Sequence, residues 1–229
     1  MKPLAPALAH AVILFAAFSC ASAPPPPEVD PAYPLPEASA ETWQAPVLSE
    51  AQRLIAEGGP TLVGKKTLVV NGVTYPNDCT GVVRAAYAFA SMDIAFRFGE
   101  FSGNGVRRLY ETLRSDGLLY SVRYPEPGDL VFWDNTWDAN GNKLADDELT
   151  HVGVVMSVEA DGSIRYLHYN YSKGTVIERM NLVLPGDELS DEEGLLNSPL
   201  RMRGSPEGPG SGSAQLFRVF GKGHELKIP

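Results

Sequence analysis

One cysteine and its neighbours give the first chemical signal in the chain. The sequence holds two cysteines, and Cys79 lies in "PNDCTGVVRAAY", where a polar turn runs into an apolar stripe of helical spacing. Asn77 and Asp78 are candidate N-caps. Cys79 then falls in the first helical turn, where free backbone N–H groups and the helix dipole favour a thiolate nucleophile. The alternative is an inert buried thiol, because cysteine is among the most buried residue types.

Histidines are the candidate bases for such a nucleophile, which also needs a third polar group to orient the base. Of four histidines, His10 lies in the N-terminal leader and His224 in the terminal "GKGHELKIP", which we expect to be solvated. His151 and His168 lie on two expected strands joined by an Asp-Gly turn at 161–162. Adjacent antiparallel strands bring side chains of one face about 5 Å apart. We therefore expect a Cys–His–His constellation with the thiol packed on this sheet.

Along the chain, the elements that must position these residues are predicted to be helices followed by antiparallel strands. This order predicts an α+β fold. Helices are expected at 47–55, after Cys79, and at 106–113. The Asn-Gly of "TLVVNGVTY" predicts a hairpin. Strands are expected at 129–133, 151–158, 164–171 and 175–180, and a last strand at 216–221 could dock back on the domain.

The N-terminus "MKPLAPALAHAVILFAAFSCASAPPPP" has the form of an export signal. Its apolar run from about Ala9 to Phe18 is too short to span a bilayer. The small residue before Cys20 resembles a bacterial lipobox, which implies a signal peptide at 1–19 and lipidation of Cys20. We expect an exported protein anchored by this lipid, with Ala21 favouring the outer membrane, facing the periplasm. The alternative is simple cleavage after Ala23, which the following prolines disfavour.

The remaining chain divides by composition. We expect a Pro-rich tether at 20–45, a catalytic domain at 46–185, and an acidic and Gly/Ser-rich segment at 186–229, with a flexible loop at 204–215. The long loops near this end could also cover the cleft as a lid. The net charge of −9 argues against nucleic acid as a partner.

Three sequence blocks in order resemble the NlpC/P60 cysteine peptidases: "DCTGVV", "PGDLVFW" and "THVGVVM". The resemblance implies a papain-like fold, with N-terminal helices packed on an antiparallel sheet. It also implies endopeptidase cleavage of peptidoglycan stem peptides without a cofactor. In this resemblance Cys79 is the nucleophile, His151 the base and His168 the residue that orients it. Asp78 and Thr80 stand at substrate-binding positions.

Alternatives stay open within this resemblance. The related CHAP amidases carry a Glu-x-Asn on the third strand, so Asn170 could orient the base instead of His168. The same scaffold also supports an amidase or acyltransferase. A wall-binding lipoprotein without turnover is the alternative outside enzymes.

The segment between 134 and 151 is rich in Asp and Asn. Asp138, Asn140 and Asn142 alternate as in the start of a calcium loop. Lys143 stands where that pattern has Gly, and no bidentate Glu follows at the required distance. A solvated hairpin turned at Asn140-Gly141 is the favoured interpretation, and we expect no metal.

Overall fold

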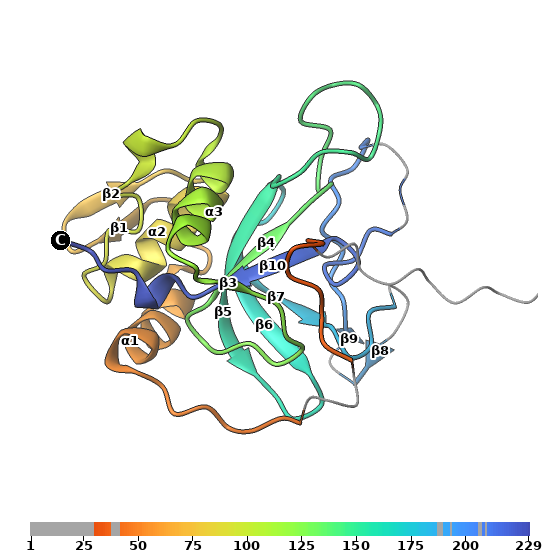
Figure 1. The fold of residues 1–229 in the computed structure, drawn as a ribbon, viewed down its shortest axis with the longest axis horizontal. Helices are drawn as coiled ribbons and strands as arrows, with labels where there is room; N and C mark the ends of the chain where they lie inside the picture. The colour runs from red at the N-terminus through yellow and green to blue at the C-terminus, as the bar shows by residue number, and fades with distance from the viewer. Residues whose placement is uncertain (1–29, 38–41, 187–189, 193, 206–207, 209) are drawn as a thin grey trace, which may run out of the picture.

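A six-stranded antiparallel sheet forms the centre of the molecule (Figure 1). The computed structural model describes residues 30–37, 42–186, 190–192, 194–205, 208 and 210–229. The strand order is β3-β10-β4-β5-β6-β7, every neighbouring pair being antiparallel. The bounds are β3 Leu119–Tyr120, β4 Leu130–Trp133, β5 His151–Val158, β6 Ser163–Asn170, β7 Gly174–Asn181 and β10 Phe217–Gly221. The strands expected from the sequence are present, and β10 lies inside the sheet, between β3 and β4.

Three helices lie on one side of this sheet (Figure 1). They are α1 Glu50–Gly58, α2 Cys79–Ala88 and α3 Gly105–Ser115, with short 3-10 turns η2 Gly59–Leu62, η3 Phe98–Glu100 and η4 Gly223–Glu225. The expected start of the first helix at Val47 is wrong. Ser49 is its N-cap and exchanges capping-box hydrogen bonds with Gln52, while Val47 is 97% exposed.

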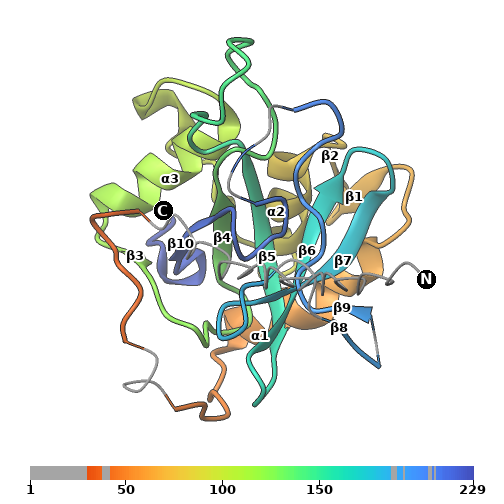
Figure 2. The ribbon, with the colours of Figure 1, turned by 90° about the vertical axis from the view of Figure 1, so that its right-hand side faces the viewer.

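The hairpin predicted from Asn-Gly is formed by β1 Leu68–Val70 and β2 Val73–Tyr75. Asn71 and Gly72 have φ of 51° and 78°, the left-handed pair that a tight hairpin turn requires. A second small hairpin, β8 Ser190–Asp191 and β9 Gly194–Leu195, lies beside β7 (Figure 2).

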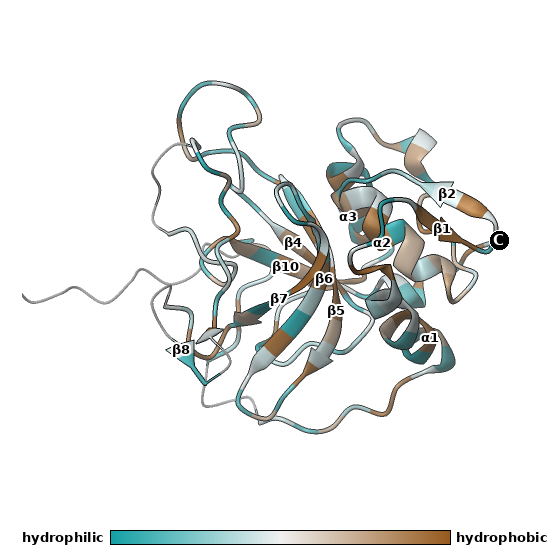
Figure 3. Ribbon diagram, turned by 180° about the vertical axis from the view of Figure 1, so that it is seen from behind, coloured by the Kyte–Doolittle hydropathy of each residue, from teal (hydrophilic) through white to brown (hydrophobic). Residues whose placement is uncertain are grey.

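Apolar residues lie along the strands (Figure 3), and their side chains form one buried cluster on each face of the sheet. In β4, Leu130 and Phe132 enter a cluster shared with the helices, while Val131 and Trp133 enter a second cluster on the opposite face. This alternation is the two-residue period of a strand buried on both sides.

The C-terminal segment covers the second face. The expectation of a flexible loop at 204–215 is wrong for its last residues, because Ser213 and Ala214 are fully buried. The indole N–H of Trp133 donates to the carbonyl oxygen of Ser213 at 2.8 Å. An apolar sheet face must be shielded from water, and this segment, rather than another helix, shields it.

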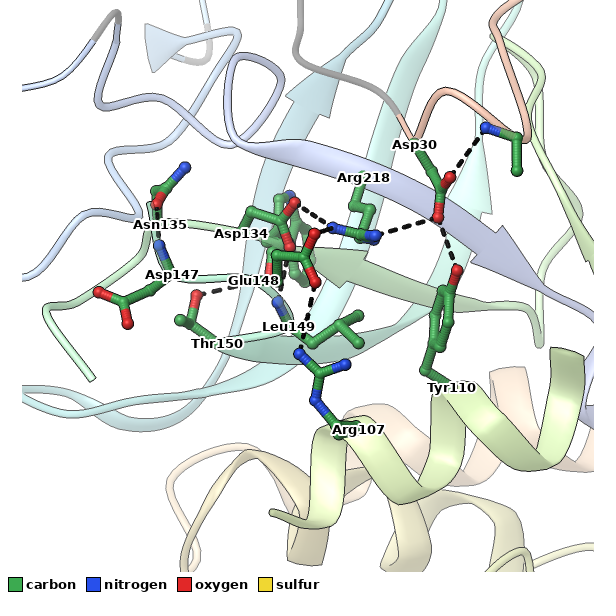
Figure 4. Close-up of polar contacts among 12 residues, drawn as sticks. Asp30, Arg107, Tyr110, Asp134, Asn135, Asp147, Glu148, Leu149, Thr150 and Arg218 are labelled. Carbon is green, nitrogen blue, oxygen red and sulfur yellow. Dashed lines mark hydrogen bonds and ion pairs between the residues drawn. The ribbon is translucent and has the colours of Figure 1, made fainter. Parts of the chain in front are cut away.

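The described part of the expected tether also packs on the domain (Figure 4). Asp30 is buried, accepts a hydrogen bond from the Tyr110 hydroxyl at 2.6 Å, and pairs with Arg218 at 3.2 Å. Arg218 also pairs with Asp134 at 2.7 Å and with Glu148 at 3.5 Å. The chain is therefore fixed to the domain at residue 30. The expected signal peptide 1–19 and Cys20 lie outside the described residues.

A search of the described residues for a helix long and apolar enough to cross a membrane finds none.

His224 differs from its expected place in a solvated tail. It lies in η4, is largely buried, and its Nε2 is 3.1 Å from Oδ1 of Asp129. Asp129 is fully buried at the start of β4 and also accepts a hydrogen bond from the Tyr120 hydroxyl. A buried carboxylate needs such donors, and the chain end provides one of them.

Candidate active site

The first turn of α2 presents Cys79, as the sequence predicts. Asp78 is the N-cap, and its Oδ1 accepts a hydrogen bond from the backbone N–H of Gly81 at 2.7 Å. Gly81 allows the preceding turn to approach closely, because a Cβ at this position would lie 1.9 Å from the carbonyl oxygen of Pro76. Cys79 is a free thiol and is only partly buried. Local capping therefore fixes the thiol where it remains accessible.

The thiol reaches the histidine strand through the backbone. Cys79 packs against the apolar cluster that contains Val152, and the backbone N–H groups of Thr80 and Val152 face its sulfur closely enough to lower the pKa of the thiol. Val152 directly follows His151, the first residue of β5. The ladder between β5 and β6 ends at Val154 and Leu167, although β6 continues to residue 170. The two strands thus part next to Cys79.

The two predicted histidines meet where these strands part. His151 Nε2 lies 2.8 Å from His168 Nδ1, and the rings are nearly perpendicular, with an angle of 88° between them. His168 is fully buried, whereas His151 is partly exposed. Trp133 packs against the ring of His151 and Tyr166 against that of His168. The second apolar cluster therefore supports both histidines from behind.

Glu178 on β7 is a member of this site that the sequence analysis missed. Its Oε2 lies 3.0 Å from His168 Nε2, and its Oε1 lies 2.7 Å from Lys173 Nζ. His168 pairs with Val176 across the β6–β7 hairpin, so Glu178 lies two residues further along the same face. The signal was a charged residue on the alternating buried face of "TVIERM".

Asn170, the alternative orienting residue, takes part in the turn instead. Its Oδ1 accepts hydrogen bonds from the backbone N–H groups of Ser172 at 3.0 Å and Lys173 at 3.2 Å. Its amide nitrogen lies 3.5 Å from Oε1 of Glu178. The side chain in contact with His151 is therefore that of His168.

The electrostatic environment differs from the expectation of a ready thiolate. Burial raises the pKa of the Cys79 thiol, and the Asp78 carboxylate raises it further, against the opposing hydrogen bonds to the sulfur. Burial lowers the pKa of His151 well below 6.5, and His168 lowers it further. Both groups are consequently neutral near pH 7, so the thiol must lose its proton during the reaction.

The two expected substrate-binding residues border Cys79. Asp78 is exposed, and Thr80 Oγ1 lies 4.0 Å from the Cys79 sulfur. Thr80 also packs against the start of α3, because a Cβ on Gly105 would lie 2.6 Å from its Oγ1. The first turns of α2 and α3 thus lie side by side next to the thiol.

The loop before His151 satisfies its own polar groups. Asp138 Oδ2 accepts from the backbone N–H of Lys143, Asn140 Oδ1 from that of Asn142, and Asn142 Oδ1 from that of Leu144. Gly141 has a φ of 73°, as a turn at Asn140-Gly141 requires. No group of three or more His, Cys, Asp or Glu side chains suited to a metal ion occurs within the described ranges. The residues between β4 and β5, all within the described part of the chain, form no strand pair, so this segment is a loop held by its own side chains and not the expected hairpin.

Comparison with family models bears on this site. Residues 69–170 match the family model of the CHAP domain, the cysteine/histidine-dependent amidohydrolase/peptidase domain, which is related to the NlpC/P60 papain-like superfamily. This indicates a hydrolase of the amidase or peptidase type. The matched stretch contains Cys79, His151 and His168 and ends before Glu178. No curated protein and no solved structure matches the chain.

Proposed function

We propose that the protein is a cysteine-dependent hydrolase of amide bonds in the peptide stems of peptidoglycan, built on a papain-like NlpC/P60 fold. The observation that carries the proposal is the arrangement of Cys79 at the start of α2, packed on the apolar cluster that contains Val152, with the neighbouring His151 in hydrogen-bond contact with His168. The CHAP match over the same residues supports a peptidoglycan peptide as substrate. The expected export and lipidation at Cys20 place the enzyme in the periplasm, next to that substrate.

The mechanism follows from the two neutral groups. His168 engages Nε2 of His151, which leaves Nδ1 to take the proton of the Cys79 thiol as sulfur attacks the carbonyl carbon. The carbonyl electrons form an oxyanion, which backbone N–H groups in the first turn of α2 stabilise. The protonated His151 then gives its proton to the leaving amine as the C–N bond breaks. Water hydrolyses the resulting thioester by the same proton transfers in reverse.

The residues around the sulfur orient the substrate. Asp78 keeps an exposed carboxylate beside Cys79 and can pair with the amino group of a stem peptide. Thr80 presents its hydroxyl on the same turn. The acidic side chain at this point suits a substrate that carries a free amine.

An endopeptidase and an amidase are the two candidate activities, and the CHAP match is compatible with both. To separate them, purified protein and its Cys79→Ala variant are incubated with peptidoglycan, and the released fragments are identified by mass spectrometry. An endopeptidase releases shortened peptides, whereas an amidase separates whole stems from the glycan. Fragments from the wild type alone are expected. Equal fragments from both proteins would contradict the proposal. The absence of fragments from either folded protein, with peptidoglycan of several wall types, would also contradict it and would favour a binding lipoprotein.

A further inference from the structure

Glu178 closes a chain of hydrogen bonds that begins at the proposed base. His151 is partly exposed, His168 behind it is fully buried, and Glu178 behind both is 8% exposed. The links are 2.8 Å between the two rings and 3.0 Å between His168 and the carboxylate. A buried carboxylate at hydrogen-bond distance from an imidazole nitrogen constrains the proton on that nitrogen.

The direction of the protons along this chain follows from the carboxylate. Lys173 and His168 hold the pKa of Glu178 below its ordinary value, although burial raises it, so the group is ionised at neutral pH. An ionised carboxylate only accepts hydrogen bonds. His168 therefore carries its proton on Nε2 and accepts at Nδ1. His151 must then carry its proton on Nε2, which leaves Nδ1 unprotonated.

We propose that Glu178 is a positioning residue that fixes the tautomers of both histidines and thereby makes His151 a proton acceptor. This inference rests on the proposed function for its role in turnover. Without the carboxylate, His168 could turn its proton toward His151, which would then hold its own proton on Nδ1. In that state His151 could not accept the thiol proton. The carboxylate also stabilises the imidazolium that forms when His151 is protonated.

Lys173 determines which end of an amide side chain at position 178 would face His168. Two donors, Lys173 Nζ and the amide of Asn170, face Oε1 of Glu178. In Glu178→Gln the amide oxygen should turn toward these donors, and the NH2 group toward His168. The replacement therefore forces a proton donor against Nε2 of His168, which is the opposite of what the carboxylate does.

The experiment compares four variants with the wild type: Glu178→Gln, Lys173→Met, the double variant, and Glu159→Gln as a carboxylate-to-amide control. Glu159 is exposed and lies in the β5–β6 turn. The readouts are kcat and KM on peptidoglycan fragments, and the protonation of the imidazole nitrogens by ¹⁵N NMR. The NMR readout needs no turnover, and a purely structural role would not move it.

We expect the wild type to carry its imidazole protons on Nε2 of both His151 and His168. Glu178→Gln should move both protons to Nδ1 and lower kcat by about 10- to 100-fold with little change in KM. The double variant should recover part of this loss, since its amide is free to present oxygen to His168. Glu159→Gln should stay close to the wild type, and Lys173→Met alone should lower kcat less than Glu178→Gln does, since the carboxylate still faces His168.

The outcomes separate the two proposals. A wild-type proton on Nδ1 of His168 overturns the inference even if Glu178→Gln does not fold. Unchanged tautomers and an unchanged kcat in folded Glu178→Gln overturn it as well. Turnover that survives Cys79→Ala overturns the proposed function instead, and leaves the NMR result to decide the tautomers.

Discussion

Two charged clusters of this molecule have opposite characters. One runs from His151 through His168 to Glu178, and the other surrounds Arg218 with the carboxylates of Asp30, Asp134 and Glu148 (Figure 4). A cavity of about 370 Å³ borders the Arg218 cluster, and Cys79 does not line it. This cavity therefore lies apart from the candidate active site.

The difference lies in which protons can move. Burial opposes the charge on Arg218, but its three carboxylates hold the pKa of the guanidinium above its ordinary value. This cluster stays charged and joins three distant segments, namely the N-terminal segment, the loop before β5, and β10. The histidine cluster contains two rings that can exchange roles as donor and acceptor. We conclude that mobile protons, rather than buried charge, distinguish the candidate active site.

Replacing the proposed base, His151, should have the largest effect on activity. His151→Ala should lower kcat/KM by about 10²- to 10⁴-fold, because the thiol then has no proton acceptor. The variant should still unfold cooperatively, with a Tm lowered by the loss of the contacts that the ring makes with Trp133 and His168. Steady-state kinetics and melting curves on the same preparation check both parts. Retained activity would show that His151 is not the base, and would remove the catalytic role from the histidine cluster.

Replacing Arg218 should give the complementary result. Arg218→Met leaves the largely buried carboxylates of Asp30 and Asp134 without a cation and should lower the free energy of unfolding by about 3–5 kcal/mol, whereas the exposed Glu148 keeps Arg107. The expected drop in Tm is about 10 °C. Arg53→Met is the control, because Arg53 forms exposed ion pairs whose loss should change stability by less than about 1 kcal/mol. Equal effects of the two variants would contradict a structural role for Arg218.

The neutral state of Cys79 predicts its reactivity with pH. A thiol with a raised pKa gains thiolate as the pH increases, so alkylation by iodoacetamide should accelerate roughly tenfold per pH unit between 7 and 9. His151, with its lowered pKa, should keep its base form down to pH values below 6.5. N-acetylcysteine in parallel gives the unperturbed curve. A rate that is already constant from pH 6 to 8 would indicate a thiolate–imidazolium pair instead.

The smallest effect is expected at Asp30. Hydrogen bonds from Tyr110 and Ala32, together with Arg218, lower the pKa of Asp30 although burial raises it. A lowered pKa in the folded state means that this group stabilises the fold above its unfolded pKa and loses that contribution as the pH falls. Asp30→Asn should therefore cost about 1–2 kcal/mol at pH 7. The difference in Tm should shrink toward pH 3, and a constant difference would show that charge is not involved.

Local patterns predicted the parts of the site that depend on neighbouring residues. The cap at Asp78 and the tight turn at 161–162 are short-range features, so Cys79 and the His151–His168 pair could be placed from the sequence. Periodicity likewise predicted the strands from 129 to 181.

The remaining features depend on contacts between distant segments. Asp30 meets Arg218, His224 meets Asp129, and Ser213 meets Trp133, each pair being far apart along the chain. No local signal marks such pairs, and a Gly- and Ser-rich segment looks flexible until the apolar face that it covers is known. Glu178 was within reach of the sequence, because the tight turn at 171–173 fixes its register with His168.

The most direct test is a rapid-quench experiment on a defined stem peptide. Intact-mass analysis should show the acyl half of the substrate attached to the wild-type enzyme, and peptide mapping should place it on Cys79. Cys79→Ala should form neither this adduct nor product. Product release by Cys79→Ala at the wild-type rate would contradict the assignment of Cys79 as the nucleophile.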